Sequence, residues 1–259
     1  MVYNITSSKN EKFKHFKALK QKKSRIEFNQ YTVEGIKSVK EALEFCDDIE
    51  CLVVSQEFYK TSDFPYPENI DLYVISTEIF ESLSTTENSQ GIIAVIRICE
   101  KTDFTLDTSK AYIYCDHLQD PGNLGTIIRT ADAAGFGGVL LSDECVELYN
   151  PKTVRSSMGS FFHIKKLENV TADNIKKFKE KGFLVVCGVL SDNTINYTDA
   201  DFTKPVIIVI GNEANGITDE ILSLSDISIK IPISGSAESL NAAIAAAILM
   251  YETNRQRNL

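Results

Sequence analysis

Three polar loops stand out in the sequence because each follows an apolar run typical of a buried strand. They cover residues 116–129, 209–217 and 231–241. The side chains in them that could do chemistry are two amides, a guanidinium, a carboxylate and a hydroxyl: Asn123, Asn241, Arg129, Glu213 and Ser239. A guanidinium stays charged and can stabilise a developing oxyanion, whereas amides and carboxylates orient a polar substrate. The loops therefore predict a polar binding crevice.

Each loop taken singly also has a plainer structural interpretation. Asn123 follows the turn Asp-Pro-Gly and could cap a helix that we expect from about Leu124. Ser236 or Ser239 could cap the Ala-rich helix that we expect from about Ser239. Gly211 suits either a tight backbone turn or the close approach of a ligand. These alternatives stay open at the level of the single loop.

The elements that would position these loops alternate between strand and helix. We expect near-continuous apolar strands at 111–115, 138–142, 161–166, 183–189, 205–210 and 227–231. Between and after them we expect helices from about Leu124, from about Lys152, near 172–181, briefly after 210, and from about Ser239. This alternation predicts an α/β fold with a mainly parallel sheet covered by helices on both faces. Ligands of such folds bind beyond the carboxyl ends of the strands, which is where the three loops would lie.

A smaller α/β unit is predicted before these elements. Residues 31–45 are typical of a strand that runs into a helix, and 51–55, 71–76 and 91–98 are typical of strands. The polar stretch Glu100 to Lys110 has no apolar periodicity and marks the expected boundary. We therefore expect one domain over residues 1–100 and a second over residues 108–259.

Composition excludes several protein classes. The chain has 259 residues, 43% of them apolar and 24% charged, as in folded globular proteins. Its longest strongly apolar stretch, Ala242 to Tyr251, is too short to cross a bilayer, and its first residues lack the apolar core of a signal peptide, so we expect no membrane association and a cytoplasmic location. The six cysteines include no Cys-x-x-Cys pair and the three histidines lie far apart, so we expect no metal.

The charge is distributed unevenly. The net charge is −9, yet residues 1–25 contain eight Lys or Arg and a single acid, Glu11. A net negative protein is a poor partner for nucleic acid unless its cations are concentrated in one place. The basic segment is therefore either a solvated helix face or a contact for nucleic acid.

The three loops together resemble a known family. NLGTIIRTADAAGFGGVLL, IVIGNEANGI and IPISGSAESLNAAIAAAI occur in the order of motifs 1, 2 and 3 of the SpoU (TrmH) family of RNA ribose 2′-O-methyltransferases, in the SPOUT superfamily. The similarity covers about residues 108–256. The basic segment and the sequence YTVEGIKSV resemble the L30e-like substrate-binding domain that many members carry.

The resemblance implies a fold, a cofactor and a site. It implies a C-terminal trefoil knot, a homodimer, and S-adenosylmethionine bound in the knot, in contact with Gly211, Ile231 and Leu240. It also implies a catalytic set around the motif 1 arginine: Arg129, Asn123, Glu213, Ser239 and Asn241. A guanidinium pKa above 12 favours Arg129 as the group that stabilises the ribose alkoxide, with an RNA phosphate as proton acceptor, over Arg129 as the base.

Other functions remain to be weighed against this one. They are methylation of a base nitrogen by another SPOUT enzyme, ribose methylation of tRNA, and RNA binding without catalysis. A nucleotide-dependent dehydrogenase or a Rossmann methyltransferase fits poorly, because no Gly-x-Gly-x-x-Gly follows the first strand. The N-terminal domain favours ribosomal RNA as the substrate.

Overall fold

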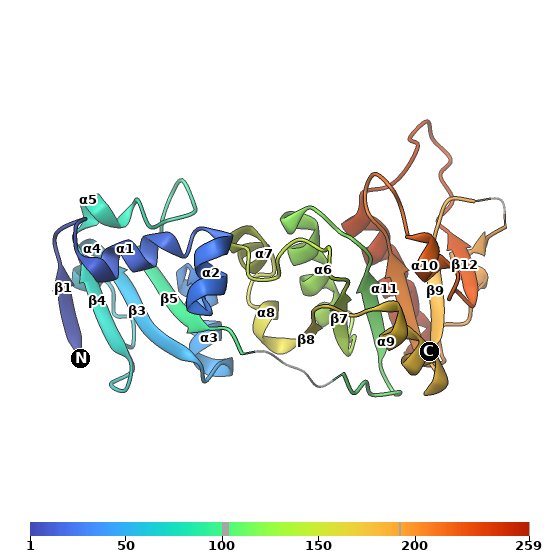
Figure 1. The fold of residues 1–259 in the computed structure, drawn as a ribbon, viewed down its shortest axis with the longest axis horizontal. Coiled ribbons are helices and arrows are strands. Elements are labelled where there is room, and N and C mark those ends of the chain that lie inside the picture. The colour runs from blue at the N-terminus through green and yellow to red at the C-terminus, as the bar shows by residue number, and fades with distance from the viewer. Residues whose placement is uncertain (100–103, 192, 259) are drawn as a thin grey trace. The chain divides into compact units, whose positions relative to one another are not determined.

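The computed structural model describes residues 1–99, 104–191 and 193–258, and the chain divides into two compact units (Figure 1). The first unit is Met1–Glu100 together with Tyr149–Phe162. The second is Lys101–Leu148 together with His163–Leu259. The segment 149–162 therefore interrupts the second unit in sequence and packs with the first.

The first unit contains a five-stranded mixed sheet of order β1-β4-β3-β5-β2. Its strands are β1 (Val2–Ile5), β2 (Gln30–Glu34), β3 (Ile49–Ser55), β4 (Asp71–Ile75) and β5 (Ile92–Arg97). β1, β4 and β3 run parallel, whereas β5 is antiparallel to both β3 and β2. The predicted strand–helix at 31–45 is confirmed, and β1 is a strand that the sequence analysis misses.

Helices cover both faces of this sheet. They are α1 (Glu11–Ala18), α2 (Lys22–Phe28), α3 (Ile36–Phe45), α4 (Gln56–Thr61), α5 (Thr77–Phe80) and α7 (Pro151–Ser156). Phe13 and Phe16 of α1 and Phe80 of α5 enter one buried cluster on the sheet, while α3 and α4 pack against its strands elsewhere. α7 packs against β2, where the ring of Tyr31 lies 4.8 Å from that of Tyr149 and 5.8 Å from that of Phe161.

The second unit contains a seven-stranded sheet of order β10-β12-β9-β11-β6-β7-β8, in which every pair is parallel. Its strands are β6 (Ala111–Cys115), β7 (Gly138–Leu141), β8 (Lys165–Leu167), β9 (Leu184–Gly188), β10 (Ile195–Asn196), β11 (Val206–Ile210) and β12 (Ile227–Lys230). The central strands are buried throughout, since Val, Ile and Leu occupy both of their faces. The predicted α/β fold with a mainly parallel sheet is confirmed.

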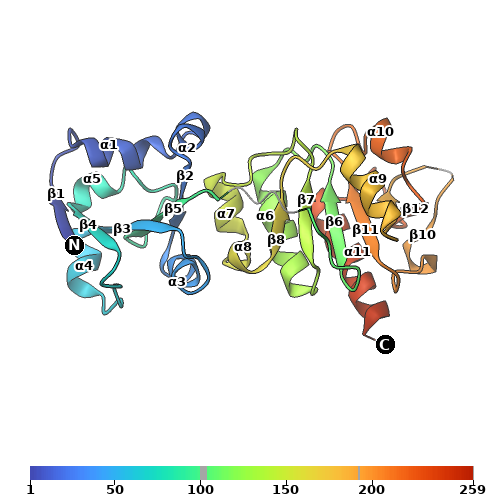
Figure 2. The same ribbon diagram turned by 60° about the horizontal axis from the view of Figure 1, so that its bottom comes forward.

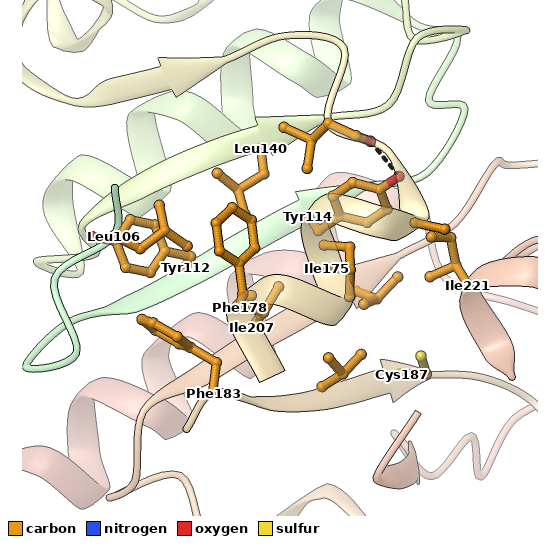
Figure 3. Close-up of a cluster of buried hydrophobic side chains, with 14 of the residues drawn as sticks. Leu106, Tyr112, Tyr114, Leu140, Ile175, Phe178, Phe183, Cys187, Ile207 and Ile221 are labelled. Carbon is orange, nitrogen blue, oxygen red and sulfur yellow. Dashed lines mark hydrogen bonds between the residues drawn. The ribbon is translucent and has the colours of Figure 1, made fainter. Parts of the chain in front are cut away.

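Helices cover both faces of the second sheet (Figure 2). They are α6 (Pro121–Ala133), α9 (Ala172–Glu180), α10 (Asp219–Leu222) and α11 (Ala242–Arg257), with a short 3₁₀ turn at Tyr197–Asp199, whereas all but the last residue of α8 (Ser160–His163) belong to the first unit. On one face, Ile175 and Phe178 of α9 pack with Tyr114, whose hydroxyl donates to the carbonyl of Val170 at 3.1 Å (Figure 3). On the other face α6 packs against α11, and α11 packs on β11.

The helix starts differ from the predicted ones at both loops of interest. α6 begins at Pro121, and its cap is Asp120, whose carboxylate accepts from the backbone N–H of Asn123 at 2.8 Å. Asn123 is therefore not the cap. α11 begins at Ala242 and is capped by Asn241, not by Ser236 or Ser239. In both cases the side chain nearest the first helical turn satisfies its free N–H groups.

One predicted strand is wrong in part. Residues 160–163 form the short helix α8, and the strand β8 starts only at Lys165. β10 at the sheet edge is also missed. The expected boundary at Glu100 to Lys110 falls partly outside the described residues. Within its described part, Leu106 is buried in the core of the second unit. The trefoil knot stays a prediction.

Two findings bear on the protein class. Within residues 1–99, 104–191 and 193–258, no helix is long and apolar enough to cross a membrane. All six cysteines are free thiols, and Cys51, Cys115 and Cys187 among them are buried.

Candidate active site

The three polar loops begin at one edge of the second sheet because the strands before them end in register. Cys115, the last residue of β6, pairs with both Ile210 of β11 and Leu141 of β7. On the far side of β11, β9 ends at Gly188, which pairs with Ile229 of β12. The loops after β6 and β11 therefore start side by side, and the loop after β12 starts at the same edge of the sheet with β9 between, as the sequence predicts.

A chain of three side chains joins these loops. The amide of Asn241 donates to Oδ1 of Asn123 at 3.0 Å, and the amide of Asn123 donates to Oε1 of Glu213 at 2.8 Å. Each residue comes from a different loop. The structure thus brings together three of the five predicted catalytic residues.

The orientation of both amides follows from the helix cap. Oδ1 of Asn241 accepts from the backbone N–H groups of Ala243 and Ile244, so only its amide nitrogen faces Asn123. Asn123 must then present its oxygen to Asn241 and its nitrogen to Glu213. The second carboxylate oxygen of Glu213 accepts from the backbone N–H of Gln119 at 3.4 Å. Helix capping therefore fixes the donors and acceptors at the site.

A buried carboxylate beneath this chain holds the loop after β11. Asp116, 1% exposed, follows β6 directly and accepts at Oδ2 from both the backbone N–H and the hydroxyl of Thr218, at 2.7 and 2.8 Å. Since burial of a charge is costly without such partners, this contact fixes Thr218 firmly. The sequence analysis misses both residues, although an acid at the end of an apolar strand is a usable signal.

Gly211 is required by the chain itself. A Cβ at this position would lie 2.2 Å from the carbonyl carbon of Gly216 and 2.4 Å from the nitrogen of Ile217. The loop closes here through two backbone hydrogen bonds between Asn212 and Gly216, at 2.8 and 2.9 Å. Of the two interpretations that the sequence leaves open for Gly211, the tight turn is the one that the geometry requires.

The third loop leaves its polar groups available. Ile231 is half-buried at the end of β12, and Ser239 and Leu240 are exposed just before the cap of α11. Within the described part of the chain, residues 232–240 make no hydrogen bond. Backbone N–H and carbonyl groups of this loop therefore face solvent or a ligand.

Arg129 stands apart from the three joined residues. It lies on the exposed side of α6, two turns beyond Asn123, while Ile127 and Ile128 beside it are buried. Among the residues that the structure describes, nothing hydrogen-bonds to it or pairs with its charge. Glu213 makes no hydrogen bond or ion pair with Arg129 in this part of the structure and accepts from Asn123 instead.

The thiols at this edge are poor nucleophiles. Burial raises the pKa of Cys115 well above its ordinary value and that of Cys187 to about 11. Burial also raises the pKa of Cys145, although hydrogen bonds to Ser142 and Leu118 oppose it. In the described ranges no group of three or more His, Cys, Asp or Glu is arranged to hold a metal ion. The site therefore offers amides, a carboxylate and an arginine for its chemistry.

Comparison with protein families gives two matches. Residues 110–251 match the SpoU rRNA Methylase family, and residues 10–94 match the MRM3-like substrate binding domain. The first match contains all three polar loops.

Individual relatives are similar over nearly the whole chain. The 23S rRNA (guanosine(2553)-2′-O)-methyltransferase RlmP of Bacillus subtilis is 37% identical over 95% of this chain and 97% of its own. The crystal structure of an AdoMet-bound rRNA methyltransferase from Sinorhizobium meliloti superposes with a TM-score of 0.88 at 32% identity, covering 98% of both chains. The SpoU methyltransferase AviRb from Streptomyces viridochromogenes, in complex with the cofactor AdoMet, has a TM-score of 0.84 at 26% identity, covering 96% of this chain and 98% of its own.

Proposed function

The chain belongs to the SpoU rRNA Methylase family, and from this premise we propose that it transfers a methyl group from S-adenosylmethionine to a ribose 2′-hydroxyl of ribosomal RNA. The observation that carries the proposal is the chain Asn241–Asn123–Glu213, which joins the three motif loops with fixed donors and acceptors. Ribosomal RNA is favoured over tRNA because RlmP of Bacillus subtilis, which is similar over 95% of this chain, is named for 23S rRNA.

We assign the cofactor to the loops after β11 and β12. Gly211, Ile231 and Leu240 are the residues that would contact it. The free backbone groups of residues 232–240 fit the polar edges of a nucleoside, and Leu240 offers apolar surface to its ring. When bound, S-adenosylmethionine supplies an electrophilic methyl group.

Arg129 would act on the substrate oxygen. Methyl transfer needs a 2′-oxygen that carries negative charge as its proton leaves, held in line with the methyl group. The exposed guanidinium has no protein partner in the described structure, so it can donate hydrogen bonds to this oxygen and to a nearby phosphate. The phosphate would take the proton.

The joined residues would hold the nucleotide in place. Glu213 accepts one hydrogen bond from Asn123 and keeps lone pairs for a ribose hydroxyl. Ser239 lies two residues before Asn241 and would contact the nucleotide through its hydroxyl. Asn123 and Asn241 set the position of Glu213.

The proposal is tested by methyl transfer in vitro. Purified protein is incubated with radiolabelled S-adenosylmethionine and 23S rRNA transcript, with tRNA as the matched control substrate. Label in rRNA that survives alkaline hydrolysis as a dinucleotide is expected, because a methylated 2′-oxygen cannot attack the neighbouring phosphate. Label released on a modified base would contradict ribose transfer. RNA binding with no label would favour the non-catalytic alternative.

We further propose a homodimer formed through α11. Ile244 and Tyr251 on this helix are 51% and 53% exposed, and Ile248 lies between them at helical spacing. Ala242, Ala243 and Ala246 of the same helix are buried within the subunit itself and are not available to a second subunit. A cytoplasmic location is part of the proposal, since free thiols and an rRNA substrate both fit a reducing compartment.

A further inference from the structure

The basic N-terminal segment folds mainly into α1 and α2 of the first unit, and its eight cations differ in their contacts. Lys14 pairs with Glu11 at 2.7 Å, and Lys12 lies 6.0 Å from the ring centroid of Tyr73. Lys20 donates from Nζ to the carbonyl of Ser84 at 2.7 Å and to that of Ser82 at 3.3 Å. Arg25 is only 2% exposed and donates from Nη1 to the carbonyls of Leu19 and Lys20, at 2.8 Å each. These two cations fix the turn between the helices and are not available to a ligand.

Four other lysines project freely. Lys9, Lys17, Lys22 and Lys23 are exposed, and in the described ranges none of their ammonium groups has a hydrogen bond or ion pair. Lys22 and Lys23 stand in the first turn of α2, which contains no acidic residue. Cations are disfavoured at this end of a helix. A residue choice that opposes local stability is typical of a surface selected for binding.

Apolar side chains are exposed next to these cations. Ile26 is 66% exposed and lies one helical turn after Lys22 and Lys23. Phe28, the last residue of α2, is 42% exposed, and its ring centroid lies 4.4 Å from that of His15 in α1. Exposed rings and aliphatic groups among cations suit unpaired nucleobases, which need a surface to stack on.

We propose that the α1–α2 surface, made of Lys9, Lys17, Lys22, Lys23, Ile26 and Phe28, docks the RNA substrate. The lysines contact backbone phosphates, and Ile26 and Phe28 contact at least one unpaired base. The inference rests on the proposed function for the identity of the RNA. Charge complementarity favours RNA, because the chain outside residues 1–25 is strongly acidic and would repel phosphates elsewhere. Lys20 and Arg25 hold the surface in place before binding.

The test compares two variants with the same change in charge. The docking variant replaces Lys9, Lys17, Lys22 and Lys23 by Gln. The control variant replaces Lys60, Lys110, Lys177 and Lys181, which are exposed elsewhere, by Gln. Binding of 23S rRNA transcript is measured from 50 to 200 mM salt. The docking variant should bind about 10- to 100-fold more weakly, with a log–log salt slope shallower by about 3. The control variant should keep the wild-type slope.

Two further measurements separate docking from chemistry. Affinity of the docking variant for S-adenosylhomocysteine by calorimetry should stay within about twofold of wild type, because the four lysines lie outside the loops that we assign to the cofactor. Phe28→Ala should weaken RNA binding about 5- to 50-fold without changing the salt slope, since a base stacked on this ring makes an uncharged contact. Thermal unfolding of the docking variant is measured as well, because both comparisons require that this variant is folded.

Defined outcomes would overturn the docking surface. An unchanged slope in the docking variant, or an equal change in the control variant, would return the lysines to a solvated face. Normal binding of transcript with lost methylation of ribosomal particles would point to a protein partner and contradict RNA docking. Lysine-dependent RNA binding by a protein that transfers no methyl group would refute the proposed function and leave the surface intact.

Discussion

The amide of Asn241 donates to Oδ1 of Asn123 at 3.0 Å, and the same Asn241 caps α11 through its oxygen. One side chain therefore serves both helix stability and the alignment of Glu213. The two roles can be separated, because only the amide nitrogen faces Asn123.

Asn241→Asp keeps a good capping oxygen but places a second acceptor against Oδ1 of Asn123. We expect its unfolding temperature to stay close to wild type and its turnover to fall about 100-fold, the scale for a misplaced substrate group. Asn241→Ala should lose turnover and also about 1 kcal/mol of stability. Thermal unfolding and initial rates at saturating substrates check both. Wild-type turnover in Asn241→Asp would show that the hydrogen bond from Asn241 to Asn123 does not contribute to catalysis.

Arg129→Ala should lower turnover by about 100-fold or more, because one donor to the developing alkoxide is removed. Arg129→Lys should be similarly poor, since an ammonium does not reproduce the planar guanidinium. Stability should change by less than about 0.5 kcal/mol, because the exposed side chain has no partner in the described structure. Affinity for S-adenosylhomocysteine should be retained. Single-turnover rates near wild type would contradict the assignment.

Gly211→Ala should abolish cofactor binding and lower the unfolding temperature, because the new Cβ would collide with the backbone of Gly216. Gly137→Ala, just before β7, is the matched control, since a Cβ there would also collide, with the side chain of Tyr112, but lies outside the three loops. Calorimetry with S-adenosylhomocysteine should find the control close to wild type. Equal affinities in the two variants would remove the turn at Gly211 from the cofactor site.

The half-buried carboxyl of Glu34 predicts that the stability of the first unit depends on pH. Burial raises the pKa of its carboxyl, but hydrogen bonds from Ser84, Thr85 and Ser89 outweigh burial and lower the pKa overall. The stabilising effect is therefore present above the ordinary carboxyl pKa and is lost as pH falls through the lowered value. Glu34→Gln should cost about 1–3 kcal/mol at pH 7, and this cost should shrink as pH falls below the ordinary carboxyl pKa. Exposed Glu81→Gln is the control, and a pH-independent cost would refute the prediction.

Ile244→Glu tests the proposed dimer, because it places a charge in the exposed apolar face of α11. Light scattering should give the mass of two chains for wild type and the mass of one, 28.9 kDa, for the variant. Thr126→Glu on the exposed side of α6 tests whether any new surface charge has this effect. Wild-type protein at the monomer mass at micromolar concentration would exclude the dimer.

The sequence predicts the second sheet well because its central strands are apolar on both faces, a signal that depends only on local residues. The residues that cap the helices are also set by local sequence, yet the caps predicted for α6 and α11 are wrong. Pro121 is favoured at the first helical position, which assigns the cap to Asp120 and not to Asn123. The strand predicted over residues 161–163 is wrong because a short apolar run alone does not distinguish a strand from a helix.

The contacts of the site lie beyond local signals. Asn241 and Asn123 are 118 residues apart, and Asn123 and Glu213 are 90 apart. Only the paired ends of the strands bring them together. The sequence could therefore name these residues through the family resemblance, but not the order in which they bond, nor that Arg129 would lie apart from Glu213.

The packing of Tyr31 has a consequence for how the chain is made. This ring, 4% exposed, is covered by Tyr149 and Phe161, which the ribosome adds long after β2. The first unit therefore cannot complete its core while it is the only part synthesised. The core of the first unit stays incomplete until residues 149–162, which follow β6 and β7 in the chain, have been synthesised. A chain cut at residue 99 would leave Tyr31 in contact with water, and a fragment for RNA-binding work needs residues 149–162 supplied with it.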